Sequence, residues 1–415
     1  MIKREIGFFI VGLLLFVVVG SFVMRSLSSP PQLSEDPSLY LETNEVSMIR
    51  TAVESESHPN TYLNSSEIAA IRAKVDSGEQ PWKAAYDRMM TEANAALSAG
   101  PYSVTYNGGP NDGHDYQTER AYCGWTAVDN KEPDCRDGQI NPNADRQDYE
   151  QAIALGKDVS TLGLAYAFTE DTQYAEKLIS LIRVWCTDPE TRMNPKFLSQ
   201  QSKIELSVSI PGMFYGADLA YSYPAWSAAD KASLEDWVSS MAQSALSWDR
   251  INNFENWRVH FIAIAGSFLK DETLLDYAFG RFKELIPIQI DRKGQLVEEI
   301  DRTTSLSYSL YALNAMIQTA ELAKHQGLNL YDYTSDNKGL ALAADYHAQF
   351  ADSEQAEDWP HEQISPLKST DSVAIFEMAH AYWHKPAHLK VVEYWGRPMT
   401  ERRVHWHISL THADN

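Results

Sequence analysis

The chain has 415 residues, which exceeds the usual domain length of about 100 to 200 residues but fits one large toroidal or barrel domain. Its 57 acidic and 35 basic residues give a formal charge of −22, which argues against nucleic acid as the main partner because phosphate binding requires a basic surface. A polyanionic substrate remains compatible, since local Arg, Lys and His side chains outweigh the global charge over a Debye length of about 8 to 10 Å.

The N-terminus, residues 1–25, has the pattern of a membrane segment. Lys3 and Arg4 precede an apolar run at residues 6–24, and Arg25 follows it. This run nearly reaches the length of about 20 residues that a bilayer requires. No clear small-residue cleavage site is evident, which favours a single-pass anchor over a cleaved signal. The positive flank then predicts that the rest of the chain lies on the periplasmic face of the inner membrane, or is periplasmic or secreted if the segment is cleaved.

Residues 26–57 are rich in Ser, Pro and Glu and predict a flexible linker. One folded domain is expected over residues 58–415, because no later composition shift marks a second boundary.

Apolar residues at helical spacing fill most of this domain, separated by turn residues. The helical patterns cover residues 65–75, 82–97, 148–168, 172–186, 228–246, 256–269, 274–286, 307–323 and 371–384. About eight to ten successive helices predict an all-α fold, and the recurring helix hairpins favour a toroid over a four-helix bundle. Residues 404–410 at the end predict a short strand.

Two long breaks interrupt the helices, at residues 101–148 and 187–203, and long loops inside a compact domain are more often functional than idle. Cys123 and Cys135 bracket part of the first break, and in an oxidising compartment this pair predicts a disulfide that closes the loop. Cys186 lies in an apolar stretch and is expected to be buried and inert.

The helix expected near residues 307–323 begins with a pair of reactive residue types. Tyr308 falls in its first turn, with Thr303, Thr304 or Ser305 available as N-cap, so that the phenol can point out of the helix end. Arg302 lies just before the helix. Taken alone, Tyr308 reads more readily as a core tyrosine and Arg302 as a solvated charge at a helix start.

A second group lies at residues 251–261. On a helix, Asn253, Trp257 and His260 share one face, while Phe254 and Arg258 share the next. For His260 a core position is as plausible as a functional one. Trp257 suits either stacking on a sugar ring or core packing, and Arg258 either substrate binding or an ion pair.

The second break and the C-terminal region supply weaker candidates. Gln200 is the better candidate for a sugar contact, whereas Asn194 precedes a proline and is typical of a turn; Lys196 lies between them. His380, His384 and His388 have the spacing of a metal stripe, but Pro386 interrupts that helix, so no metal site or cofactor is expected.

Five ordered motifs carry a resemblance to a known family. They are RDGQINPNADRQD (136–148), LAYAFTEDTQYAEKLISLIRVW (164–185), TRMNPKFLSQ (191–200), INNFENWR (251–258) and DRTTSLSYSLYAL (301–313). Together they resemble the alginate lyases of the poly-mannuronate and glucuronan lyase type. The resemblance implies an incomplete (α/α) toroid with a groove for an acidic polysaccharide, and β-elimination at a uronate.

The chemistry of β-elimination explains why a site of this kind needs Arg, His, Asn and Tyr side chains. Removal of the C5 proton requires that the uronate carboxylate be neutralised, which Arg, protonated His and Asn amides can do. A base then takes the proton and an acid protonates the departing O4. The resemblance gives both of these roles to Tyr308. Arg302 and Asn253 are expected to neutralise the carboxylate.

The sequence departs from the family pattern Asn-Asn-His at Phe254, which occupies the position of the histidine. His260 and Arg258 are the candidates to replace it, although His260 lies about 9 Å further along the helix axis.

We therefore expect a polysaccharide lyase that cleaves a β-1,4-linked polyuronate, either alginate or glucuronan. Two alternatives stay open. One is a non-catalytic polyuronate-binding protein of an export system. The other is a glycoside hydrolase that uses Glu298 with Asp301 or Glu299.

Overall fold

The computed structural model describes residues 57–109, 111–118, 123, 139, 141–142, 144–401, 403 and 407–414. The membrane segment at residues 1–25, nearly all of the linker at residues 26–57, and Cys135 lie outside these ranges. Within the ranges, no helix is both long and apolar enough to cross a membrane.

The described part of the chain is mostly helical and has almost no sheet, which confirms the all-α prediction. Its helices are α1 (Ser65–Asp76), α2 (Trp82–Ala96), α3 (Gln147–Thr169), α4 (Thr172–Ile182), α5 (Gln200–Ser209), α6 (Pro211–Ala220), α7 (Ala228–Leu246), α8 (Asn253–Leu269), α9 (Glu272–Gln289), α10 (Ser305–His325), α11 (Leu340–Ala351), α12 (Ile375–Trp383), α13 (Pro386–Trp395) and α14 (Ile408–His412). A 3₁₀ turn at Val104–Asn107, a π-helical turn at Arg183–Thr187 and a two-residue hairpin of β1 (Thr334–Ser335) and β2 (Lys338–Gly339) complete the set.

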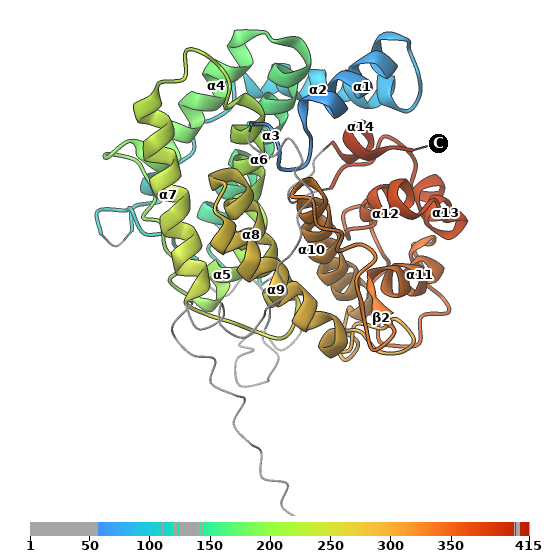
Figure 1. Cartoon of the computed structure of the whole chain (residues 1–415). Helices are drawn as coiled ribbons and strands as arrows, with labels where there is room; N and C mark the ends of the chain where they lie inside the picture. The colour runs from blue at the N-terminus through green and yellow to red at the C-terminus, as the bar shows by residue number, and fades with distance from the viewer. Residues whose placement is uncertain are drawn as a thin grey trace, which may run out of the picture. The chain divides into compact units, whose positions relative to one another are not determined.

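The helices of the described residues pack both on their neighbours in the sequence, such as α3 on α4 and α8 on α9, and on more distant helices. Figure 1 shows α3, α6, α8 and α10 in the middle of the view, with α4 and α7 on one side and α11, α12 and α13 on the other. The closest packing joins α3 to α6 and α8 to α10, while α7 and α9 cover α8. Pairing inner helices with outer ones in this way is the arrangement of an (α/α) toroid.

Glycines allow α3 and α6 to approach closely. A Cβ atom on Gly216 would lie 2.2 Å from the backbone oxygen of Val159, and one on Gly156 would lie 2.2 Å from the backbone oxygen of Ser209. Any larger side chain at either position would therefore push the two helices apart.

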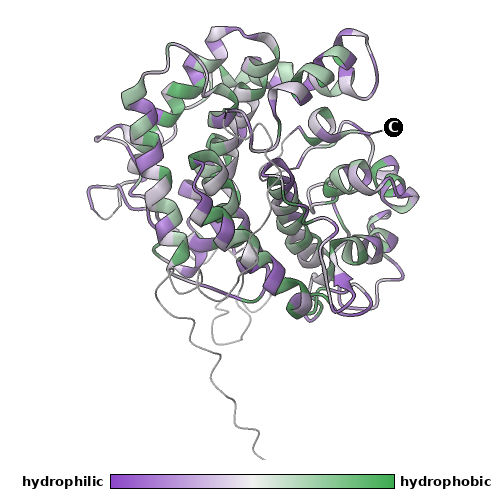
Figure 2. Ribbon diagram, in the orientation of Figure 1, coloured by the Kyte–Doolittle hydropathy of each residue, from purple (hydrophilic) through white to green (hydrophobic). Residues whose placement is uncertain are grey.

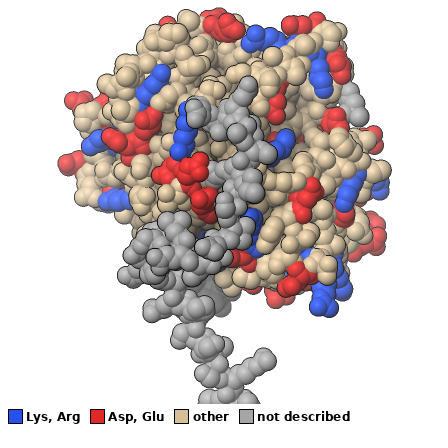
Figure 3. Space-filling view, in the orientation of Figure 1, with Lys and Arg blue, Asp and Glu red and all other residues tan. Residues whose placement is uncertain are grey.

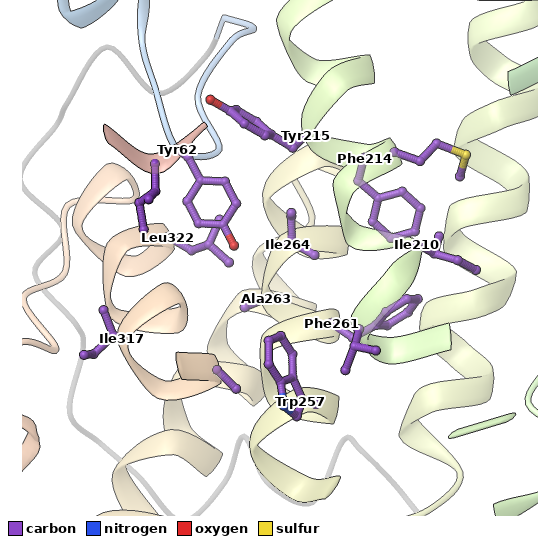
Figure 4. Close-up of a cluster of buried hydrophobic side chains, with 14 of the residues drawn as sticks. Tyr62, Ile210, Phe214, Tyr215, Trp257, Phe261, Ala263, Ile264, Ile317 and Leu322 are labelled. Atoms are coloured by element: carbon purple, nitrogen blue, oxygen red, sulfur yellow. The ribbon is translucent and has the colours of Figure 1, made fainter. Parts of the chain in front are cut away.

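The core fills the space between the inner helices. Figure 4 shows part of it, with Trp257 and Phe261 of α8 among the buried side chains. Most helices carry both hydrophobic and hydrophilic positions (Figure 2), as expected where one face of a helix packs and the other meets water. The exceptions are α6, which is buried throughout, and most of α8.

The structure corrects two expectations from the sequence. Helix α5 begins inside the second expected break, where Ser199 caps it by accepting a hydrogen bond from the backbone N of Ser202. The predicted C-terminal strand is wrong over its described end, because Ile408–His412 form helix α14. This short helix packs against α12 and α2 and has no neighbouring strand among the described residues.

Candidate active site

Arg302 and Tyr308 meet at the start of α10. The guanidinium carbon of Arg302 lies 3.5 Å from the centroid of the Tyr308 ring, which is a close cation–π contact. Tyr308 is half-buried, and the side chain of Arg302 is 8% exposed. Arg302 and Tyr308, which the sequence places together at the start of this helix, are therefore in contact in the structure.

A distant segment caps the helix that carries Tyr308. Thr304 is the N-cap residue but its side chain makes no capping hydrogen bond. The side-chain oxygen of Gln363 instead accepts a hydrogen bond from the backbone N of Leu306 at 3.0 Å, and Ser305 donates its backbone N to the oxygen of Glu362. The first turn of α10 is thus fixed by residues more than fifty positions later in the chain.

A buried carboxylate, Glu299, joins Asn253 to Arg302. The backbone N of Asn253 donates to one Glu299 oxygen at 2.7 Å, and its side-chain Nδ2 lies 2.9 Å from both oxygens. Nη1 of Arg302 lies 3.7 Å from Glu299 Oε2. Asn253 and Glu299 are both 1% exposed. Asn253, expected to contact a substrate carboxylate, therefore directs its amide to a carboxylate of the protein.

The charge of Glu299 is incompletely balanced. Burial raises the pKa of Glu299 to about 7, although the hydrogen bonds from Asn253 and the charge of Arg302 oppose the rise. Near neutral pH the two forms of this carboxyl group are therefore close in free energy, and the ionised form holds Asn253 and Arg302 more strongly.

Arg258 lies in a different buried network. Its side chain is fully buried and donates to Glu255 from Nε at 2.9 Å and from Nη2 at 2.6 Å, and to the Tyr277 hydroxyl at 2.9 Å. Arg281 also donates to Glu255, at 2.7 Å. Since it has no exposed surface, Arg258 supports the fold in this structure and does not line a substrate site.

His260 is also remote from the pair at the start of α10. It is fully buried, and its Nε2 lies 2.5 Å from the hydroxyl of Tyr62. Burial lowers the pKa of His260 to about 3, so the ring is neutral at physiological pH. Neither His260 nor Arg258 therefore takes the place of a histidine at Phe254, which packs half-buried against the core.

The remaining candidates divide between core and surface. Trp257 is fully buried, 5.1 Å from the Tyr311 ring between centroids, so it packs in the core and offers no face to a sugar. Gln200 is exposed at the first position of α5 and accepts a hydrogen bond from Arg250. Asn194 donates to Asp115 at 2.8 Å, which ties the second long break to the first.

The structure gives the surroundings of one cysteine, Cys186, and of the C-terminal histidines. Cys186 is a buried free cysteine, and burial raises the pKa of its thiol, as expected for an inert residue. Because Cys135 lies outside the described residues, its disulfide with Cys123 stays a prediction. His384 pairs with Asp414 and His388 with Asp345, and among the described residues no group of three His, Cys, Asp or Glu side chains could hold a metal ion.

The face of the molecule drawn in Figure 3 has no broad patch of positive or of negative charge over the described residues. Figure 3 shows acidic and basic side chains interspersed over this face of the described residues. Attraction of a polyanion would therefore depend on individual cations such as Arg302, as the net charge led us to expect.

The family model described as alginate lyase matches residues 104–358, more than half of the chain. The chain belongs to the alginate lyase family. This membership makes the chain a polysaccharide lyase that acts on an alginate-like polyuronate, and it confirms the resemblance stated from the five motifs. No curated protein matches the chain significantly.

Solved alginate lyases share the fold of this family member. An alginate lyase from Bacteroides ovatus is 22% identical, with a TM-score of 0.71 over 86% of this chain and 100% of its own. Alginate lyase A1-III from a Sphingomonas species is 19% identical, with a TM-score of 0.61 over 86% of this chain and 100% of its own. A Tyr-to-Phe variant of A1-III, complexed with a tetrasaccharide, is 20% identical, with a TM-score of 0.63 over 86% of this chain and 99% of its own.

Two neighbours of Arg302 and Tyr308 were not predicted from the sequence. Glu299 was considered there only as a carboxylate for hydrolysis, whereas in the structure it binds Asn253 and lies 3.7 Å from Arg302. Tyr311, one turn after Tyr308, was not singled out, yet Arg403 lies over its ring with the guanidinium carbon 4.3 Å from the centroid. No local pattern in the sequence links Arg403 to α10.

Proposed function

We propose that the chain cleaves a β-1,4-linked polyuronate by syn β-elimination at the start of α10. The observation that carries the proposal is the stacking of Arg302 on Tyr308 in a chain of the alginate lyase family. The proposal goes beyond family membership in naming the linkage, the reacting residues and their roles.

In this proposal the phenolate of Tyr308 removes the C5 proton, and the phenol so formed protonates O4 as the C4–O4 bond breaks. One residue can do both jobs in mannuronate because the two atoms lie on the same side of the sugar. Arg302 binds the uronate carboxylate, and its positive charge stabilises the dianion that develops after proton removal. Its place against the Tyr308 ring brings the carboxylate site and the base together.

Asn253 and Glu299 are positioning residues in this proposal. The Asn253 amide is bound to Glu299, and Glu299 attracts the guanidinium of Arg302 from the buried side. Together they fix the orientation of the arginine that faces the substrate. A Tyr-to-Phe variant and a His-to-Ala variant of the structural relative A1-III were each complexed with a tetrasaccharide, which supports an oligosaccharide as the ligand of this fold.

The test is a screen of the purified chain from Ser26 to Asn415 against polymannuronate, polyguluronate, mixed alginate and glucuronan. We expect absorbance in the unsaturated-uronate band to rise with at least one β-1,4-linked polymer. Mass spectrometry should show products without added water, because elimination adds none and hydrolysis does. Folded protein that cleaves none of these polymers, or that yields hydrated products, would contradict the proposal.

We also propose that the enzyme acts outside the cytoplasm, anchored through residues 1–25, with Cys123 and Cys135 joined in a disulfide. The support is the charge and hydropathy of the N-terminus and the placement of the cysteines around one loop. Membrane fractionation of the full chain tests the anchor, and mass mapping of peptides without reductant tests the disulfide.

A further inference from the structure

The amide of Gln363 binds both the backbone and a side chain of the first turn of α10, the turn that carries Tyr308. Its Oε1 accepts hydrogen bonds from the backbone N of Leu306 at 3.0 Å and from that of Ser307 at 3.5 Å. Its Nε2 donates to the Ser307 hydroxyl at 3.0 Å and to the backbone oxygen of Ser365 at 2.9 Å. One side chain from a distant segment therefore satisfies backbone N–H groups that α10 cannot pair internally.

The segment that carries Gln363 is itself held in place. Thr304 and Gln363 form an antiparallel backbone bridge. Nε1 of Trp359 donates to the Ser305 hydroxyl at 2.7 Å, and the Trp359 ring packs against Phe350 of α11, 5.1 Å away between centroids. Trp359 is 7% exposed. The cap is therefore presented by a segment packed on α11, so that the position of the first turn of α10 is set by the surrounding fold.

The start of α10 differs in charge from the starts of neighbouring helices. Helices α1, α7, α8 and α9 each have an acidic residue in the first turn, whereas α10 has none. The positive end of the α10 dipole is thus not compensated by its own first turn, and an amide cap adds no charge to it. This suits a base that must ionise, because a positive helix end favours the phenolate of Tyr308.

The charged side chains around Tyr308 come from separate segments. Arg302, just before α10, lies over its ring, and Glu299 lies 3.7 Å from the guanidinium. Asp371 accepts a hydrogen bond at 3.4 Å from the hydroxyl of the residue that precedes the tyrosine. Burial raises the pKa of Asp371, and the charge of Arg403 opposes that rise. A charged cap at the start of α10 would alter this balance, whereas an amide leaves it unchanged.

We propose that Gln363 is a positioning residue for the elimination: its uncharged amide fixes the first turn of α10 and thereby aligns the phenol of Tyr308 with the sugar that Arg302 binds. The inference rests on the proposed function and deepens it, because it gives the alignment of the base to a residue that follows it by more than fifty positions. Gln363 itself does not touch the reacting atoms. A small displacement of the base is enough to slow proton transfer, since the rate depends steeply on the geometry of the reacting atoms.

The first experiment removes the cap and compares kinetics with folding. Gln363→Ala should lower kcat about tenfold and change KM less than about twofold, because Arg302 and not the turn binds the substrate carboxylate. Asn64→Ala is the matched control. Asn64 caps α1, whose Glu67 carboxylate lies 3.6 Å from the His325 ring at the opposite end of α10. Thermal unfolding should show a similar loss of stability in both variants, and only Gln363→Ala should lose kcat.

A second variant, Gln363→Glu, keeps the acceptor oxygen that binds Leu306 and replaces the donor by a negative charge. That charge disfavours the phenolate of Tyr308, so the rise of kcat with pH should move to higher pH by about half a unit or more. Hydrogen exchange of the backbone at residues 303–309 gives a measurement independent of turnover. Exchange should be faster in Gln363→Ala than in the unchanged protein, with Gln363→Glu between the two.

The inference would be overturned if Gln363→Ala lost stability but kept its kcat, as expected of Asn64→Ala. It would also be overturned if Gln363→Glu had the pH dependence of the unchanged enzyme, or if exchange at residues 303–309 were the same in all of these proteins. Absence of cleavage by the unchanged enzyme would count against the proposed function, while the exchange measurement would still decide whether Gln363 holds the turn.

Discussion

Two buried carboxylates near the start of α8, Glu255 and Glu299, have similar surroundings and opposite properties. Glu255 accepts hydrogen bonds from Arg258 and Arg281 and from the backbone N of Arg250. Burial alone would raise its pKa, but these partners hold the pKa of Glu255 below its ordinary value. Glu299 has the Asn253 amide and only the more distant Arg302, and its pKa is raised to about 7.

The difference separates a structural ion group from a candidate active site. At Glu255 two arginines bind one buried carboxylate, and Arg258 has no exposed surface for a ligand. At Glu299 the carboxylate is weakly paired, and Arg302 reaches the half-buried ring of Tyr308. A buried carboxyl group with a strongly shifted pKa beside a half-buried tyrosine is typical of a functional site.

The largest expected effect is at Tyr308. Tyr308→Phe removes the phenol that exchanges protons with the substrate, and we expect kcat to fall by about a hundredfold or more while oligomer binding persists. Tyr311→Phe tests the neighbouring tyrosine: it removes that hydroxyl but keeps the ring beneath Arg403, and we expect a smaller loss of kcat than at Tyr308. Initial rates and calorimetric binding measure both. If Tyr311→Phe caused the larger loss, the base would be Tyr311; a binding protein without turnover would show no rate in either variant or in the unchanged chain.

The second prediction compares the same substitution at two arginines, Arg258 and Arg302. Arg258→Met leaves Glu255 with one arginine fewer in a fully buried position, so the free energy of unfolding should fall by about 3 kcal/mol or more, with little change in the rate of the folded protein. Arg302→Met should lower kcat/KM by about ten- to a hundredfold through loss of charge-assisted hydrogen bonds to the substrate, with a smaller change in stability.

Urea unfolding and initial rates of both variants test this comparison. Similar effects of the two substitutions on both quantities would show that the two carboxylate groups do not differ in role.

The sequence predicted the helices best where the apolar pattern was amphipathic, as in α2 and α4. Among the helices that it missed are α5, which is polar for a buried helix, and α6, which is buried on every side and begins with a proline. Neither of these two has an apolar stripe at helical spacing. Within the site, motif order placed Arg302 and Tyr308 correctly at the start of α10. It could not reveal that Arg258 and His260 are buried, because the helix face that meets solvent depends on how α7 and α9 cover α8. Nor could it connect Arg403 with Tyr311, since tertiary packing alone brings these segments together.

The third effect is the pH dependence that Glu299 imposes. The folded-state pKa of Glu299, about 7, lies above its ordinary value of 4.5, so the folded protein keeps this proton after the unfolded chain has lost it. Its contribution to stability is therefore full below about pH 4.5 and is lost as pH rises to 7, at about 1.4 kcal/mol per pH unit. Glu255, whose pKa is lowered, contributes in the opposite sense and loses its stabilising effect as pH falls.

Activity should follow the opposite trend at Glu299, because only the ionised form binds Asn253 and Arg302 strongly. We expect kcat/KM to increase as pH rises through about 7, and Glu299→Gln to remove this step and to lower the rate above pH 7 by up to about tenfold. The same variant should be stabilised relative to the unchanged chain at pH 8 compared with pH 5, because it has no proton to lose. Rate profiles and urea unfolding at both pH values provide the test. A step near pH 7 that persists in Glu299→Gln would assign it to another group and leave Glu299, like Glu255, a purely structural residue.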